Sequence, residues 1–154
     1  MFNKEIYIKE MTEMVNKAIE RMKNEKPNFI IFTTSIWTDP NSTASSIGFD
    51  SKKNSLKNVE KSNEWDKKYY EEYLAKGDLE MAELFKPDEA TRMCNPAVYD
   101  LKDFEEITNL SFPTNWESET KGNCWKELTP ALREIGKYTF DQIKQLNLED
   151  GFEL

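Results

Sequence analysis

Hydrophobic and polar residues alternate with a helical period over the first part of the chain. Lys, Glu and Arg separate apolar residues that recur every three or four positions, namely Ile8, Met11, Val15, Ala18, Ile19 and Met22. This spacing predicts an amphipathic helix. Asn3 is a suitable N-cap, and Pro27 is expected to end the helix and lead into a strand.

The stretch from Phe29 to Phe49 has the only clear strand-turn-strand pattern. Residues 29–37 are nearly all β-branched or aromatic, which is typical of a strand that is at least partly buried. Residues 38–43 are turn formers, and Ile47 and Phe49 then fall on one face of a returning strand. We therefore predict a hairpin over 29–49, which helices must cover because an isolated hairpin is marginal in water.

The next region gives weaker signals. Residues 50–62 are polar and lysine-rich without a usable period, which predicts an exposed connection. Ser62 or Asn63 is expected to cap a helix that follows. An aromatic stripe at i, i+4 and i+8 marks that helix, and its spacing is typical of core packing; it comprises Trp65, Tyr69 and Tyr73.

Shorter elements are expected between residues 77 and 110. Gly77 fits the end of the aromatic helix, and a short helix is predicted over 78–85. Val98 and Tyr99 are expected to form a short third strand. Asp100 and Asp103 then resemble the start of a helix that contains Leu101, Phe104 and Ile107.

The last third combines a loop and a helix. Residues 111–123 predict a long loop, of a length that is often functional. Thr129 and Pro130 form a cap and first-position pair for a final amphipathic helix, with the stripe Leu132, Ile135, Thr139, Ile143 and Leu146. These patterns predict one α+β domain over 1–154, in which a small antiparallel sheet centred on the hairpin packs against N-terminal and C-terminal amphipathic helices.

Charge indicates the kind of partner. The net charge is −8, and residues 61–154 hold 21 acidic and 12 basic side chains. This field disfavours nucleic acid and anionic membranes as partners and favours a basic protein, although acidic excess is also a common means of keeping a protein soluble. The chain shows no secretory signal or membrane span, so we expect a cytoplasmic location.

The chain lacks the residues that several common kinds of catalysis require. The chain has no histidine, which removes histidine bases and histidine-ligated zinc, and its five glycines form no phosphate-binding loop. Cys94 and Cys124 lack partner motifs and are predicted to be free thiols. We therefore expect no cofactor.

Carboxylates leave one enzymatic alternative open. Asp39, Asp50, Asp66, Glu71 and Glu72 would have to meet to form an acid/base pair or a divalent-metal site. Turn formation, strand ends and a solvated helix face account for the same residues without catalysis. A hydrolase that depends on carboxylates and a divalent metal is thus an alternative hypothesis.

The order of features resembles a bacterial family. An amphipathic helix, a strand bounded by Pro27, the Trp37-Thr38-Asp39 turn, a return strand and an acidic helix with Trp65 are similar to domain of unknown function 4303 over residues 1–75. The resemblance implies an immunity protein encoded beside a secreted toxin, and it implies no catalytic residues. The yeast cell-wall-regulator-like immunity superfamily, also α+β and acidic, is the second family considered.

Our main hypothesis is a non-enzymatic module that binds and neutralises a basic protein such as a toxin. The acidic candidates lie within residues 64–106, which hold 13 acidic and 6 basic side chains, and acidic surfaces speed association with cationic partners. Trp116, in a polar loop, either docks inward or anchors the interface. The acidic candidates are Glu71, Glu72, Glu80, Glu83, Asp88, Glu89, Glu105 and Glu106. A regulatory adaptor is a further alternative.

Overall fold

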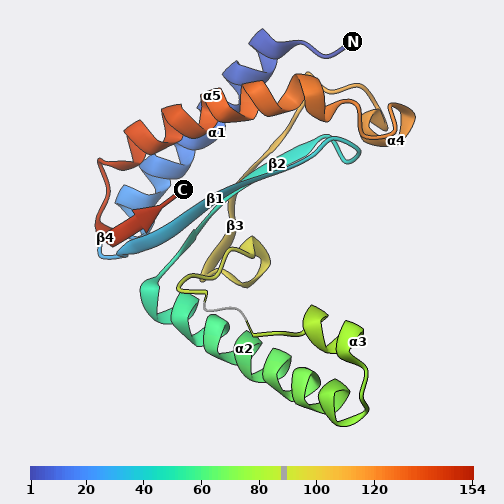
Figure 1. Ribbon diagram of the computed structural model, residues 1–154. Coiled ribbons are helices and arrows are strands. Elements are labelled where there is room, and N and C mark those ends of the chain that lie inside the picture. Colours follow the sequence, from blue (N-terminus) through green and yellow to red (C-terminus); the bar gives the residue numbers. More distant parts are fainter. Residues whose placement is uncertain (88–89) are drawn as a thin grey trace.

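The computed structural model describes residues 1–87 and 90–154 and has an α+β fold (Figure 1). Helices α1 (Lys4–Glu25) and α5 (Trp125–Ile143) cover one face of a four-stranded sheet. Its strands are β1 (Ile31–Asp39), β2 (Ala44–Asp50), β3 (Leu101–Thr108) and β4 (Leu148–Glu153). Helix α2 (Lys52–Ala75) runs away from the sheet with α3 (Leu79–Leu84) beside its far half, and two short helices are η1 (Pro96–Val98) and α4 (Trp116–Glu119).

The structure confirms the first helix that the hydrophobic pattern predicts. The side chain of Asn3 accepts a hydrogen bond from the backbone N–H of Ile6 at 3.1 Å, so it caps the helix as predicted. The core lies between α1, α5 and the sheet. It is formed by the buried stripes of both helices with Ile31, Ile47 and Phe49 of the hairpin.

The predicted hairpin is the centre of the sheet. Strands β1 and β2 pair antiparallel from Thr33↔Asp50 to Asp39↔Ala44, and the strand order is β3-β2-β1-β4. The sheet is mixed rather than wholly antiparallel, because β4 runs parallel to β1. The sequence of β4 is acidic and has no strand pattern, so it acquires strand structure only through this long-range pairing.

The third strand is β3, and the predicted helix over residues 101–107 is wrong. The apolar residues of β3 are three positions apart, at Leu101, Phe104 and Ile107. A strand can have this spacing here because the register with β2 is irregular and Asp103 has φ of 45°. Such an irregularity moves apolar residues out of the two-residue period of a regular strand. Val98, predicted as a strand, lies in η1.

The predicted connection at residues 50–62 is also wrong. Helix α2 starts at Lys52, capped by Ser51 rather than by Ser62 or Asn63, and of its 24 residues only Ser55 and Val59 are buried. A helix that buries so little shows no apolar stripe to detect. The aromatic residues of α2 are not core either: Trp65 is 53% exposed, and the ring cluster that it forms lies outside the main core.

Two boundaries differ near the C-terminal helix. Helix α5 begins at Trp125, so Pro130 lies inside it rather than at its first position. The predicted loop 111–123 contains α4, which docks Trp116 onto Phe2 and Phe112, with ring centroids 4.7 and 5.3 Å away. The short helix at Asp78 is confirmed, and Gly77, with φ of 74°, follows the end of α2.

Candidate protein-binding site on the helical arm

Helices α2 and α3 form an arm. Polar contacts of Ser51 and Asn54 join the start of this arm, which we call its root, to the sheet. Ser51 caps α2 at the N–H of Asn54, and its hydroxyl donates to a carboxylate oxygen of Asp100. The amide of Asn54 donates to Oδ1 of Asp50 and to the carbonyl of Val98, both at 2.8 Å. These bonds fix the direction in which the arm leaves the sheet.

Asp50 is the buried acid of this root. Its side chain is fully buried, and burial is the main reason why its pKa is raised, although hydrogen bonds from Asn54 and Asp100 oppose the change. Oδ1 accepts those hydrogen bonds, whereas Oδ2 has no partner within the described residues. An unpartnered buried oxygen disfavours the charged form of the carboxyl group.

An aromatic cluster holds α3 against α2. The ring of Phe85, which follows α3, lies 5.4 Å from the rings of Tyr73 and Tyr69 and 5.6 Å from that of Trp65. The three partner rings come from one side of α2 at the predicted i, i+4, i+8 spacing. The rings of this stripe therefore pack against the residue that follows α3 rather than against the core, and they remain only partly buried.

The free end of the arm combines exposed leucines with exposed carboxylates. We call residues 71–84 the arm tip. It contains five acidic residues and one lysine. Leu79 is 70% and Leu84 is 74% exposed, and Leu74 is 41% exposed. Large apolar side chains that remain in water next to charged groups are typical of interaction surfaces.

The near half of α2 has the opposite charge. Residues 52–68 hold six lysines and three acidic residues. A groove of about 680 Å³ runs along this half, lined by Asn58, Lys61, Ser62, Glu64, Trp65, Lys68, Met93, Asn95 and Val98. The charge of the arm thus changes from basic along the near half of α2 to acidic at the tip, which holds five of the 13 acidic residues of the 64–106 region.

The structure brings four of the predicted partner-binding residues together. Glu71 and Glu72 in the last turns of α2 and Glu80 and Glu83 on α3 are all exposed at the arm tip. A hydrogen bond from Lys76 lowers the pKa of Glu72, so this carboxylate is charged at neutral pH. The predicted residues Asp88 and Glu89 lie outside the described residues.

Three other predicted residues do not join this group. Glu105 is 6% exposed and binds Lys17 and Arg21 of α1 at 2.7 and 2.8 Å, so it is not free to meet a partner. Glu106 is exposed on β3, in the sheet. Trp116 is 5% exposed, and it therefore belongs to the core and is not an exposed interface anchor.

The carboxylates proposed for a metal site are spread over the molecule. Asp39 and Asp50 lie at opposite ends of the hairpin, and Asp66, Glu71 and Glu72 lie on α2. Asp39 accepts hydrogen bonds from the hydroxyl and N–H of Ser42 and from the N–H of Asn41, which lower its pKa. Among the described residues, no three His, Cys, Asp or Glu side chains lie close enough together to hold a metal ion.

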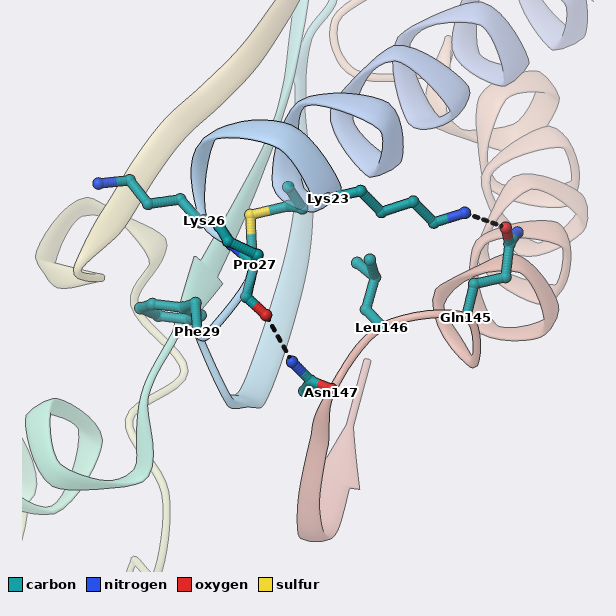
Figure 2. A pocket seen from close by; sticks show the side chains of 8 residues that line it. Lys23, Lys26, Pro27, Phe29, Gln145, Leu146 and Asn147 are labelled. Carbon is teal, nitrogen blue, oxygen red and sulfur yellow. Dashed lines mark hydrogen bonds between the residues drawn. The ribbon is translucent and has the colours of Figure 1, made fainter.

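A small cavity just before the start of β1 has a structural role (Figure 2). It has a volume of about 160 Å³ and lies where α1, α5 and the start of β4 meet. Lys23 donates to Gln145 at 2.7 Å, and the amide of Asn147 donates to the carbonyl of Pro27 at 2.9 Å. These two hydrogen bonds join residues in or just after α1 to residues that follow α5, which favours a structural role.

Comparisons with known proteins identify no relative: no protein-family model, no curated protein and no solved structure matches this chain. The resemblance to domain of unknown function 4303 therefore stays a prediction. No helix in the described part of the chain has the length and apolar character needed to cross a membrane. The acidic residues of the arm tip are visible in the sequence, whereas the exposure of Leu74, Leu79 and Leu84 is visible only in the structure.

Proposed function

We propose that this protein binds a basic partner protein through the arm tip and thereby neutralises it, as an immunity protein neutralises its toxin. The observation that carries the proposal is the exposure of Leu74, Leu79 and Leu84 beside Glu71, Glu72, Glu80 and Glu83 on a projecting arm. Leucines supply apolar area to bury, and carboxylates attract and orient a cationic surface.

The chemistry of the tip suits binding better than catalysis. Its carboxylates are exposed, and those of Glu72 and Glu83 pair with nearby Lys76 and Lys86 at 2.7 and 3.2 Å. Exposed pairs of this kind are weak and exchange readily with a partner's cations. The net charge of −8 adds long-range attraction to a basic protein.

Affinity co-purification from the native host tests the proposal. At low salt we expect the protein to retain a strongly basic partner, and high salt should weaken the complex because the attraction is electrostatic. Identifying the partner as the product of an adjacent gene would support the immunity role. Retention that does not change between low and high salt would contradict it.

Matched variants locate the interface. Glu80→Lys with Glu83→Lys should abolish retention of the partner, since it reverses charge beside Leu79 and Leu84. Glu13→Lys with Glu20→Lys changes the net charge equally on exposed positions of α1 and should retain the partner. Equal losses with both pairs would show that net charge alone matters and that the arm tip is not the interface.

A further inference from the structure

The sheet has an open edge far from the arm. Strand β4 pairs with β1 only at Ile31 and Thr33, so residues 34–39 of β1 have a neighbouring strand on one side only, β2. No other strand in the described ranges 1–87 and 90–154 lies against this half of β1. Such an edge leaves every second backbone N–H and C=O without a ladder partner.

The opposite edge of the sheet, β3, is protected in ways that this half of β1 is not. Strand β3 carries Lys102, Asp103, Glu105 and Glu106, its register is irregular, and Arg21 donates to the carbonyl of Phe104. Charge and irregular pairing are the usual devices that stop a sheet from adding strands. Residues 34–38 of β1 are uncharged and keep a regular register with β2.

A groove of about 580 Å³ lies between this edge and α5. Its lining from β1 is Thr34, Ser35 and Ile36, and that from α5 includes Gly136 and Phe140. Thr34 is 2% exposed, and its hydroxyl has no hydrogen-bond partner within the described residues. Because buried hydroxyls are nearly always bonded, the Thr34 hydroxyl is a free hydrogen-bonding group at the side of the groove formed by β1.

Gly136 keeps the groove open. It lies in the interior of α5, where glycine is disfavoured relative to alanine. No close helix contact requires it, since a Cβ built at this position meets no atom within 4 Å. The absence of a side chain at Gly136 therefore leaves space along the edge instead of improving the packing of α5.

The side of the groove formed by α5, which we call its rim, is positively charged, and Leu154, which follows β4, also lines the groove. Arg133 and Lys137 lie one helical turn apart on α5, both line the groove, and both are exposed. Neither takes part in an ion pair within the described part of the chain, whereas Glu134 beside them is paired with Lys4. In a protein of net charge −8, this rim selects for an anionic group.

We propose that the groove binds an extended, carboxylate-bearing segment of another protein, which adds to the sheet as a strand beside residues 34–39. Six residues of β-strand extend about 20 Å, and main-chain bonds to the edge would provide affinity. Arg133 and Lys137 would select acidic side chains. A second copy of this chain fits less well, since edge-to-edge pairing of two β1 strands would bring two basic rims together.

A pair of synthetic peptides tests this site independently of the arm. The probes are acetyl-Thr-Glu-Val-Glu-Val-Glu-Thr-amide and its counterpart with Lys in place of Glu, titrated into isotopically labelled protein and followed by NMR. We expect the acidic peptide to shift the amide signals of residues 34–39 and to bind at least about tenfold more tightly than the basic one. No binding of the acidic peptide at about 1 mM, or shifts centred on β3 or the arm, would overturn the proposal.

Two sets of variants complete the test. Gly136→Leu fills the groove and should abolish binding, whereas Gly136→Ala should retain it; equal binding by both variants would show that the groove is not the site. Arg133→Glu with Lys137→Glu changes only exposed side chains and should reverse the preference between the two peptides. An unchanged preference would eliminate the basic rim as the selecting feature. Thermal melting establishes that each variant is folded.

Discussion

The ring of Phe85 stacks on the ring of Tyr73 with a centroid distance of 5.4 Å and an interplanar angle of 12°. Phe85 also contacts Trp65 and Tyr69, so one side chain after α3 meets three rings of α2. Helix α3 has only six residues, which is too short to be stable alone in water. The position of Leu79 and Leu84 therefore depends on this contact.

Replacing Phe85 by alanine should release α3 without unfolding the sheet. We expect a local loss of about 1–3 kcal/mol, because aromatic burial is removed from a partly exposed cluster. Hydrogen exchange should become faster for the amides of residues 79–84 and change little for those of α1 and α5. Leu84→Ala, at a position that is 74% exposed, is the control and should have little effect. Unchanged exchange in both variants would contradict the role of Phe85.

Replacing Trp116 by alanine should destabilise the whole fold. Its ring packs on Phe2 and Phe112 in the main core, and large-to-small changes at such sites cost about 3–5 kcal/mol. Chemical denaturation measures this loss. Trp65→Ala, at the 53% exposed tryptophan of α2, should cost clearly less. Similar losses for the two variants would show that Trp116 contributes no more to the core than an arm residue does.

The parts of the fold that follow from short-range physics could be predicted from sequence. The period of α1 and its Asn3 cap, the hairpin chemistry of 29–49 and the α3 start at Asp78 are local signals, and the structure confirms each of them. Strand β3 could not be predicted this way, because its irregular register gives apolar residues a spacing of three. Strand β4 depends on pairing with a distant strand.

The candidate site was predictable in its charges but not in its geometry. Acidic residues at 71–83 are visible in the sequence, whereas their exposure depends on how α3 folds back along α2. Glu105 looks like any other acidic candidate in sequence. Only the tertiary fold shows that α1 places Lys17 and Arg21 against it.

Glu105→Gln should lower stability at neutral pH. Burial alone would raise the pKa of Glu105, but hydrogen bonds and charges from Lys17 and Arg21 outweigh it and lower the pKa. The charged form is thus favoured in the folded state, with a contribution of about 1–3 kcal/mol for charged hydrogen bonds. This contribution is present above the unfolded pKa, near 4.5, and is lost as pH falls through the folded pKa.

Chemical denaturation at several pH values tests the role of Glu105. The difference in unfolding free energy between wild type and Glu105→Gln should be largest near neutral pH and shrink below about pH 4.5. Glu106→Gln, which changes the adjacent but exposed carboxylate of β3, should alter stability little at any of these pH values. A difference that does not vary with pH would mean that the ion pairs of Glu105 do not stabilise the fold.

Asp50→Asn should gain stability relative to wild type as pH rises toward neutral, whereas Glu105→Gln should lose it. Burial raises the pKa of Asp50 above its ordinary value of 3.8, so the folded state binds more protons than the unfolded state between the two pKa values. Wild-type stability must therefore fall as pH rises through this window. Asparagine has no charge to bury and retains an oxygen for the hydrogen bonds from Asn54 and Asp100, but its NH2 group takes the place of the unpartnered Oδ2, and this cost is the same at every pH. Denaturation curves should show the variant gaining stability relative to wild type as pH rises from 3.8, followed by a difference that no longer changes with pH. A variant that loses stability relative to wild type over that range would mean that the fold favours the charged form of Asp50.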